Sequence, residues 1–467
     1  MIEYNIYEEL VLLTTIYIIF TFIPILMKNK QQQIKLGCFK SKMIKKKKIG
    51  LLTNELPPII YGGVSTWVLN FMKMFENDEQ YEAIPIFLAY MDKAPDNFPE
   101  KYPGIRIINT PEEVYDVFKD IDIVVNNLWI ALDTVKQIGH LFPKLPIVSV
   151  CHSLIKMEHI TNLGSQYTSN YCKQEVTFQY SDFVVLISKA EKKYYESFGY
   201  NKYGAVPVVI YNSYKPKYDD VNLNIDYTSD NIGYIGRHVP RKRPELPILA
   251  VNKLGNNNID VINMGVDFSK GGNDYWKKLI NKYDQLKVIP FSCDKKKISS
   301  FWSQVGANSI TGIYEPFGYT MCETLDRRVP AIVQNLDGPS EIINELKEYV
   351  FMYEVEQDMD KDIDNFSEAV TKFWNTSPEK RKYMAKKARL ALERFKPEVI
   401  KNDWKNVLDE CSSPNFESKR KRDIINDSNS NELLSDYLPL TKKSIARRVT
   451  SFMKKYLLRK EKKNKKS

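Results

Sequence analysis

The chain has 467 residues, with 68 Lys and Arg against 58 Asp and Glu and a formal net charge of +10. Its 43% hydrophobic and 12% aromatic residues exclude a disordered chain, and its 19 Gly and 23 Pro exclude collagen-like and low-complexity architectures. Residues 412–467 carry 16 Lys and Arg against 6 Asp and Glu, and residues 1–48 carry 9 Lys against 3 Glu, so residues 49–411 have a net charge of −6. Basic tails suit an anionic surface, whereas an acidic core argues against a nucleic-acid-reading domain.

The N-terminal end predicts a membrane anchor. After a short tail over residues 1–9, residues 10–27 form an uncharged run, which as a helix would span about 27 Å of a ~30 Å hydrocarbon core. Glutamates precede this run and a basic linker over residues 28–48 follows it, so the positive-inside rule predicts a single-pass protein whose bulk faces the cytosol. The alternatives are a buried helix and a cleaved signal peptide, although the leader MIEYNIYEE lacks a basic segment.

Residues 49–212 predict a doubly wound, Rossmann-like α/β domain. Short apolar and β-branched runs alternate there with segments of helix length, which is the pattern of a parallel sheet buried on both faces. The predicted strands cover residues 49–54, 83–90, 105–109, 121–127, 146–152, 183–188 and 206–212.

A polar linker over residues 213–229 leads into a second array of the same kind, which we predict to cover residues 230–396. Helices end the array, including one over residues 377–394, and a closing helix follows over residues 397–411. Two such domains facing each other place a ligand cleft between the carboxyl ends of their sheets. The predicted strands cover residues 231–237, 260–265, 286–291, 309–312, 330–334 and 349–353.

The C-terminal end predicts a flexible linker over residues 412–440 and a basic amphipathic helix over residues 441–467. Apolar residues recur at spacings of three and four from Ile445 to Leu457, and Lys and Arg fill most of the opposite face. Such a helix lies well on an anionic membrane leaflet. A solvated basic helix, a nuclear-localisation signal and an RNA-binding tail are the alternatives.

No metal site is predicted. The six cysteines stand singly, and with the four histidines they form no zinc-type spacing. Unpaired cysteines suit a reducing compartment. Aspartate pairs of the D-x-D type can bind manganese, but Asp120 and Asp122 precede a strand, and the two pairs over residues 358–364 are interpreted as an acidic surface run.

Two elements could hold a diphosphate. Gly62 and Gly63 precede a helix that we expect to start near Val64, and the free N–H groups of a helix start bind anions. Arg237 leaves a predicted strand and Lys242 begins the next helix, so both aim at the cleft and could neutralise a diphosphate. A tight turn and a solvated basic turn are the alternatives. The absence of G-x-G-x-x-G and Walker A sequences weighs against ordinary NAD and P-loop sites.

Glu315 and Glu323 carry the most weight. They flank the segment PFGYTMC, in which Pro316 and Gly318 predict a strand–turn–helix junction with the helix starting near Pro316. Glu315 would then lie at the mouth of the cleft, and Glu323 would lie about two turns along the helix. One carboxylate could bind sugar hydroxyls at the reacting end and the other a ribose.

Three motifs occur in order along the chain: GGVSTW at 62–67, Arg237 with Lys242, and an E-x7-E motif formed by Glu315 and Glu323. In this set the sequence resembles the GT-B retaining glycosyltransferases of family 4. The resemblance covers about residues 49–411, including VCHS at 150–153 and DGPSEII at 337–343. It implies that the first domain is the acceptor side and the second the nucleotide-sugar domain. It also implies that the donor phosphates bind near Gly62 and Gly63 and that the donor sugar binds near His152. Arg237 and Lys242 would stabilise the leaving diphosphate. Glu315 would bind sugar hydroxyls, Glu323 would bind a ribose, and Gly318 would offer backbone N–H groups.

Three positions depart from the family pattern. Gly312 stands where the family often has Ser, and Arg328 stands where it usually has Gly. Asn212 and Ser213 replace a strand-ending Asn-Gly pair. Arg328 is the departure with the most direct bearing on the geometry at the end of the helix that carries Glu323.

The sequence therefore predicts a membrane-associated retaining glycosyltransferase that needs neither a metal nor another cofactor. It would move a hexose from a UDP- or GDP-hexose to a hydroxyl group of a glycan, a lipid-linked sugar or a protein. The family implies front-face attack, with the acceptor proton taken by the leaving phosphate. The alternatives are a DNA-base glucosyltransferase of the same fold, a nucleotide-sugar epimerase and a degenerate membrane-tethered scaffold.

Overall fold

The computed structural model describes residues 45–60, 62–162, 170–218, 225–256, 258–266, 273–290, 292, 294–356, 358–418 and 420. The predicted anchor over residues 10–27 and the predicted helix over residues 441–467 lie outside this part of the chain, as does the linker beyond residue 420. Among the described residues, no helix combines the length and the apolar composition that crossing a bilayer requires. Lys47 and Asp78–Tyr81 belong to a small separate unit, and the description below concerns the body of the chain.

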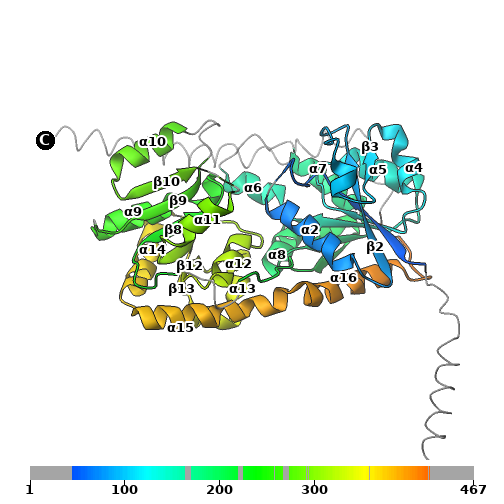
Figure 1. Cartoon of the computed structure of the whole chain (residues 1–467). Helices are drawn as coiled ribbons and strands as arrows, with labels where there is room; N and C mark the ends of the chain where they lie inside the picture. The colour runs from blue at the N-terminus through cyan, green and yellow to red at the C-terminus, as the bar shows by residue number, and fades with distance from the viewer. Residues whose placement is uncertain are drawn as a thin grey trace, which may run out of the picture. The chain divides into compact units, whose positions relative to one another are not determined.

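The first sheet has seven strands in the order β3-β2-β1-β4-β5-β6-β7 (Figure 1). The ladders β2–β3, β1–β4, β4–β5, β5–β6 and β6–β7 are parallel, as predicted from the continuous apolar runs. We call this sheet and its helices the N-lobe. Its strands are β1 (Lys47–Leu52), β2 (Tyr81–Leu88), β3 (Arg106–Ile108), β4 (Ile123–Asn126), β5 (Ile147–Cys151), β6 (Phe183–Leu186) and β7 (Val206–Val209).

The second sheet has six parallel strands in the order β10-β9-β8-β11-β12-β13. We call this sheet and its helices the C-lobe. Each strand overlaps one predicted from the sequence, so the α/β architecture with two doubly wound sheets is confirmed. The strands are β8 (Ile232–Ile235), β9 (Val261–Val266), β10 (Leu286–Pro290), β11 (Ala307–Ile310), β12 (Ala331–Gln334) and β13 (Phe351–Tyr353).

Helices cover both sheets in the order expected for strand–helix alternation (Figure 1). The N-lobe contains α2 (Gly63–Phe75), α3 (Phe98–Lys101), η1 (Pro111–Glu113), α4 (Val114–Phe118), α5 (Leu132–Leu141), α6 (Ile155–Thr161), α7 (Asn170–Gln179), α8 (Lys189–Ser197) and η3 (Tyr200–Tyr203). The C-lobe contains η4 (Pro240–Lys242), α9 (Leu246–Leu254), α10 (Asn273–Lys282), α11 (Lys295–Trp302), α12 (Tyr319–Asp326), α13 (Asp337–Ile343), η5 (Asn344–Tyr349), α14 (Met359–Trp374), α15 (Pro378–Ala388) and η6 (Arg389–Phe395), and α16 (Pro397–Cys411) follows.

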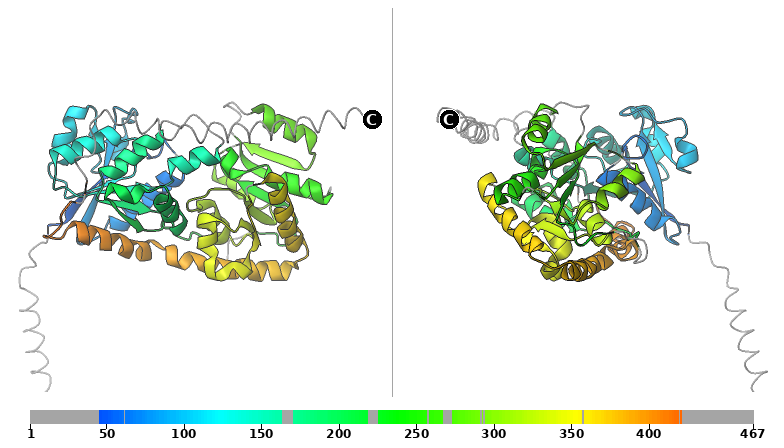
Figure 2. Two further views of the ribbon diagram at one scale, coloured as in Figure 1. Left: turned by 180° about the vertical axis from the view of Figure 1, so that it is seen from behind. Right: turned by 60° about the vertical axis from the view of Figure 1, so that its left-hand side comes forward.

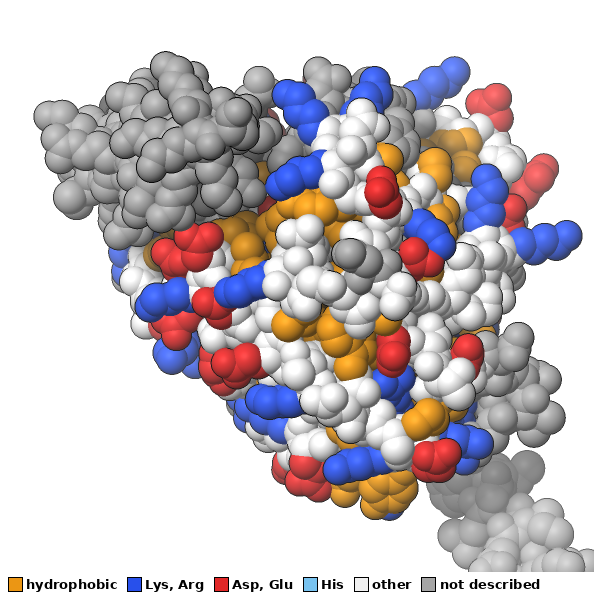
Figure 3. Space-filling view, turned by 90° about the vertical axis from the view of Figure 1, so that its left-hand side faces the viewer, with side chains coloured by type: hydrophobic (Ala, Val, Ile, Leu, Met, Phe, Trp, Pro, Cys, Tyr) orange, Lys and Arg blue, Asp and Glu red, His pale blue; other side chains and the backbone are white. Residues whose placement is uncertain are grey.

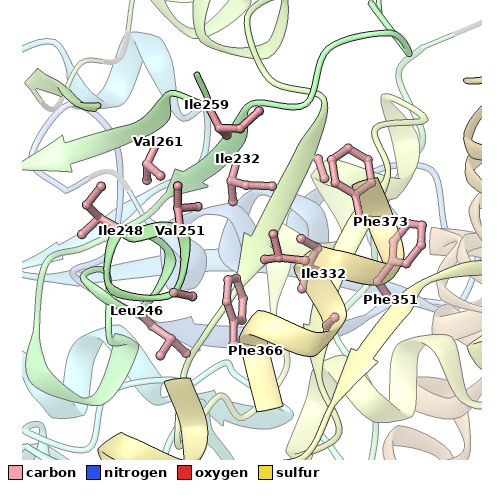
Figure 4. Close-up of a cluster of buried hydrophobic side chains, with 14 of the residues drawn as sticks. Ile232, Leu246, Ile248, Val251, Ile259, Val261, Ile332, Phe351, Phe366 and Phe373 are labelled. Atoms are coloured by element: carbon pink, nitrogen blue, oxygen red, sulfur yellow. The ribbon is translucent and has the colours of Figure 1, made fainter. Parts of the chain in front are cut away.

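A large cluster of buried hydrophobic side chains lies in the C-lobe (Figure 4). Ile232 and Ile332 of the sheet and Phe366 and Phe373 of α14 are each fully buried in it. A buried side chain of this size contributes about 1.5–3 kcal/mol relative to leaving it exposed. This cluster fixes the sheet whose strand ends carry the candidate site.

The closing helix α16 has the predicted bounds and packs on the N-lobe (Figures 1 and 2). Its Trp404 contacts Phe71 and Trp67 of α2, with ring centroids 5.0 Å and 5.9 Å apart. The helix therefore ties the end of the C-lobe to the helix that follows the paired glycines.

The interpretation of the aspartate pairs over residues 358–364 as a surface run was wrong for Asp362. Asp362 was assigned to an acidic surface run, but it is fully buried in α14 and pairs with Arg243. Asp358 caps α14 by accepting hydrogen bonds from the N–H groups of Asp360 and Lys361. Residues that face the same side of a helix are three or four positions apart, so the apolar neighbours of Asp362 lie one turn away along the chain. The alternation of acidic residues therefore does not reveal which side of the helix packs inward.

Candidate active site

Lys242 and Glu315 form the centre of the candidate site. Lys242 is the last residue of η4, rather than the first residue of a longer helix, and Glu315 lies between β11 and α12. Their side chains form an ion pair and are only 18% and 16% exposed. Burial and the charges of Arg241 and Arg237 lower the pKa of Lys242, whereas contact with a carboxylate favours its charged form. Two side chains that the sequence assigned to a diphosphate and a sugar therefore contact each other.

Arg237 lies two residues beyond the end of β8 and is exposed. Its positive charge acts on Lys242 and also on Glu55, in the loop after β1. Burial raises the pKa of Glu55, and Arg237 opposes that rise. Arg237 of the C-lobe thus lies within electrostatic reach of a carboxyl group of the N-lobe. Sequence reasoning assigned no role to Glu55, although it lies only two residues before the paired prolines of the glycine-containing loop.

The loop that carries Glu315 is held by α13. The N–H group of Glu315 donates to Oδ2 of Asp337 at 3.1 Å, and the N–H group of Gly338 donates to the carbonyl oxygen of Glu315 at 3.0 Å. A Cβ atom on Gly338 would lie 2.2 Å from the carbonyl oxygen of Phe317, so only glycine fits beside this loop. The DGPSEII segment therefore acts as the support of the E-x7-E motif.

The start of α12 differs from the prediction. The helix begins at Tyr319 rather than near Pro316, because Gly318 has φ 106° and ψ 63° and breaks the helical path there. Gly318 is the N-cap residue and admits this left-handed conformation without a steric penalty. Glu323 consequently lies in the second turn of a shorter helix.

The turn formed by Gly62 and Gly63 lies next to Tyr319, the first residue of α12. A Cβ atom on Gly63 would lie 3.3 Å from Cδ2 of Tyr319. The helix α2 starts at Gly63, one residue earlier than expected, and Gly62 is its extended N-cap. The N–H group of Gly62 donates to Oγ of Ser65 at 2.8 Å, so this donor is engaged within the helix start. The structure thus brings Gly63 and the beginning of the E-x7-E helix together.

His152 follows β5 and packs edge-on against Trp67, with ring centroids 4.9 Å apart. Burial lowers the pKa of His152 to about 3, so the imidazole is neutral at physiological pH. Its Nε2 atom is buried and has no hydrogen-bond partner among the described residues. Such an atom is a group to which a substrate hydroxyl could bond.

Glu323 is partly buried on α12, and burial raises its pKa while Arg327 and Lys217 lower it. Within the described residues its carboxylate forms no ion pair, and Arg327 instead donates to its backbone carbonyl at 3.2 Å. No hydrogen bond or ion pair joins Glu323 or His152 directly to the Lys242–Glu315 pair in this part of the chain.

Arg328 occupies a position that glycine would normally take. Its φ of 55° lies in the left-handed region just after α12, a conformation that glycine adopts far more readily than other residues. Its backbone carbonyl accepts a hydrogen bond from Tyr227 at 3.0 Å, and its guanidinium donates to the carbonyl oxygen of Tyr218 at 3.4 Å. The helix end therefore keeps the expected geometry despite the substitution.

Several buried groups at this site were not predicted. Glu191 is fully buried at α8, and its Oε1 accepts hydrogen bonds from the N–H group of Leu154 at 2.6 Å and from the hydroxyl of Tyr314 at 2.7 Å. Asp337 is 7% exposed, and burial raises its pKa to about 7. The sequence SKAEKK reads as an exposed helix start, so it contains no signal for a buried acid at Glu191.

Comparison with known proteins places this geometry in context. Residues 219–391 match the model of the family "Glycosyl transferases group 1". A curated relative, a probable sucrose-phosphate synthase of Thermosipho melanesiensis, is 26% identical over 189 residues, which cover 37% of this chain and 43% of the relative. The match thus spans less than half the length of that relative.

Solved structures resemble the whole body of the chain. Sucrose-phosphate synthase from Thermosynechococcus elongatus has a TM-score of 0.63 at 15% identity and covers 78% of this chain and 98% of its own. HepE from Anabaena in complex with UDP and glucose has a TM-score of 0.57 at 17% identity and covers 78% of this chain and 99% of its own. Residues 219–391 therefore match the glycosyl transferases group 1 model, and they lie within a two-lobed fold like that of these solved structures.

Proposed function

We propose that this chain is a retaining, metal-independent glycosyltransferase that transfers a hexose from a nucleotide-diphosphate sugar to a hydroxyl acceptor. The contact between Lys242 and Glu315, with Arg237 in electrostatic reach, is the observation that carries the proposal. It joins the cation expected to bind a diphosphate to the carboxylate expected to bind a sugar. Those two groups are covalently adjacent in a nucleotide-diphosphate sugar.

The reaction requires stabilisation of a leaving diphosphate. As the bond between the anomeric carbon and the phosphate oxygen breaks, negative charge grows on the diphosphate, and fixed cations stabilise it where it develops. Lys242 and Arg237 supply two positive charges for this purpose, so the proposal assigns no step to a metal. The acceptor oxygen would attack the anomeric carbon from the same face, and its proton would pass to the departing phosphate.

His152 and Glu315 would hold the hexose. The neutral imidazole has an unpartnered Nε2 atom that can accept or donate a hydrogen bond to a sugar hydroxyl. The carboxylate of Glu315 can accept hydrogen bonds from hydroxyls once the diphosphate has taken over its contact with Lys242. UDP-glucose, which is named for solved structures of HepE, is the first donor to test.

The test is donor turnover by the full chain. UDP- and GDP-hexoses are screened for hydrolysis and transfer in the presence of EDTA. We expect one hexose to be released, and Lys242→Met to lower the rate at least about 10²-fold because a transition-state cation is lost. The matched control is Lys253→Met, since Lys253 pairs with Asp364 in the same lobe but is 50% exposed, and its rate should stay within twofold of the wild type.

The outcomes are distinct. Absence of both donor binding and turnover would contradict the enzyme proposal and favour a degenerate scaffold. Turnover only with Mn²⁺ would contradict metal independence, and an epimerised nucleotide sugar as product would identify an epimerase. Transfer to DNA would identify the base glucosyltransferase, although the face shown in Figure 3 intersperses Lys and Arg with Asp and Glu rather than presenting one sign of charge.

We also propose that the enzyme works at a cytosolic membrane surface, with a glycan, a lipid-linked sugar or a protein as acceptor. This rests on the apolar run over residues 10–27 and the basic amphipathic pattern over residues 441–467. The full chain should remain in the membrane fraction after alkaline carbonate extraction. Release into the supernatant would contradict an anchor.

A further inference from the structure

The helix α8 of the N-lobe contacts the supports of the Glu315 loop in the C-lobe. The hydroxyl of Tyr194 donates to Oδ1 of Asp337 at 2.8 Å, while Oδ2 of the same carboxylate accepts the N–H group of Glu315 at 3.1 Å. One carboxyl group therefore joins a helix of the N-lobe to the backbone of the proposed sugar-binding residue.

A second contact reaches the residue directly before Glu315. The Tyr314 hydroxyl donates to Oε1 of Glu191 and accepts the N–H group of Leu154, at 2.7 Å each. Glu191 and Tyr314 are both fully buried. Because Leu154 follows β5 by three residues, these bonds also fix the segment that carries His152. The same tyrosine thus ties Glu315 to both α8 and the His152 loop.

A third contact holds α8 against α13. The Glu341 carboxylate accepts the N–H groups of Lys189 at 3.0 Å and Ala190 at 2.6 Å, at the first turn of α8. It also accepts the hydroxyl of Tyr211 at 2.7 Å. A carboxylate is stabilised at a helix N-terminus, so this contact favours the juxtaposition of the two helices. Asp337 begins α13 with a φ of 51°, a strained conformation that persists only where surrounding contacts enforce it.

We infer that α8 is a positioning element for Glu315, in which Tyr194 acts through Asp337 and Glu191 acts through Tyr314. The inference rests on the proposed function, since it assigns α8 the task of holding Glu315 where the donor sugar binds. Neither Tyr194 nor Glu191 touches the reacting atoms. Both act only while the N-lobe and C-lobe contact each other, so the placement of Glu315 against the bound donor sugar during transfer depends on that contact.

The central experiment compares Tyr194→Phe with Tyr195→Phe in the full chain. Tyr195 is the neighbouring residue of α8, is fully buried, and donates to the carbonyl oxygen of Tyr200 at 3.3 Å within the N-lobe. Both substitutions remove one hydroxyl and keep the ring. We expect Tyr194→Phe to lower kcat about tenfold with a less than twofold change in donor KM, and Tyr195→Phe to leave kcat within twofold.

A conservative rescue tests the second contact. Glu191→Gln keeps an oxygen that can accept from Tyr314 and Leu154, whereas Glu191→Leu removes it. We expect Glu191→Gln to retain at least several times the kcat of Glu191→Leu. Equal kcat values for the two variants would overturn the role of this hydrogen bond.

A readout without donor separates this inference from the proposed function. Hydrogen exchange of the peptide that contains Glu315 should accelerate about tenfold in Tyr194→Phe and stay unchanged in Tyr195→Phe, because only Tyr194 contacts the carboxylate that binds the Glu315 N–H group. Wild-type turnover decides the proposed function. Unchanged exchange and unchanged kcat in Tyr194→Phe would refute the positioning role, even if the chain proves to be a glycosyltransferase.

Discussion

The buried acid Glu191 makes the stability of the protein depend on pH in a defined direction. Burial raises the pKa of Glu191 to about 8 from a normal value of 4.5, and the charges of Asp337 and Glu158 add to the rise. Hydrogen bonds from Tyr314 and Leu154 oppose it but do not offset the burial. Cys151 lies 3.9 Å from Oε1 and is a buried thiol that supplies no positive charge.

The sign and size of the effect follow from proton linkage. Between pH 4.5 and pH 8 the native protein keeps the Glu191 proton that the unfolded chain releases, so native stability falls as the pH rises through this range. With these two pKa values, the loss between pH 5 and pH 7 is about 2.5 kcal/mol. Glu191→Gln cannot ionise and should show none of this loss.

The assay is the free energy of unfolding in urea at pH 5, 6 and 7 for the wild type and for Glu191→Gln. Other titrating groups cancel in the difference between the two proteins, which should shift by about 2.5 kcal/mol in favour of the variant from pH 5 to pH 7. Glu368→Gln, on the exposed face of α14, is the control and should give a constant difference. A difference for Glu191→Gln that does not change with pH would refute the reasoning.

Three further substitutions have defined outcomes. Asp326→Ala should lower the free energy of unfolding in urea by about 3 kcal/mol, because the fully buried carboxylate binds Tyr214, the Lys217 N–H group and Arg389, and its loss leaves them unpaired. Gly338→Ala should lower the melting temperature and donor kcat/KM together, since the new Cβ would lie 2.2 Å from a backbone oxygen of the Glu315 loop; unchanged kcat/KM would count against the role of this close approach. Arg328→Gly should change stability by less than about 1 kcal/mol in a thermal melt, whereas Arg328→Ile should cost about 1–2 kcal/mol more than Arg328→Gly, because φ is 55° at this position.

The fold could be predicted because buried parallel strands have a strong local signal. Every strand of both sheets lies within or beside an apolar run, and the closing helix α16 has its predicted bounds. The predicted start of a helix was less accurate where it depends on the backbone conformation of one residue. The shift of the α12 start from Pro316 to Tyr319 depends on the positive φ of Gly318, which residue types alone do not reveal.

The candidate site was predicted residue by residue but not as a set of contacts. Spacing placed Lys242 at the start of a helix and Glu315 at the mouth of the cleft, yet it gave no indication that they would form an ion pair. Asp337 lies 22 residues beyond Glu315, and Glu191 lies 123 residues before Tyr314. Contacts of this kind arise when separate elements meet, and no periodicity in the sequence reports them.

The ion pair of Lys242 and Glu315 explains how two mostly buried, opposite charges can be accommodated at the candidate site in the absence of a ligand. A mostly buried ammonium without a partner would be strongly destabilising, and the carboxylate removes that penalty in the absence of ligand. A nucleotide-diphosphate sugar offers a diphosphate to the ammonium and hydroxyls to the carboxylate, so it can replace the pair without leaving either group unsatisfied. A free sugar offers only hydroxyls and free diphosphate only anionic oxygens. Under the proposed function, the pair would therefore favour the intact donor over either of its parts, and the proposed role of α8 would preserve this selectivity by keeping Glu315 beside Lys242.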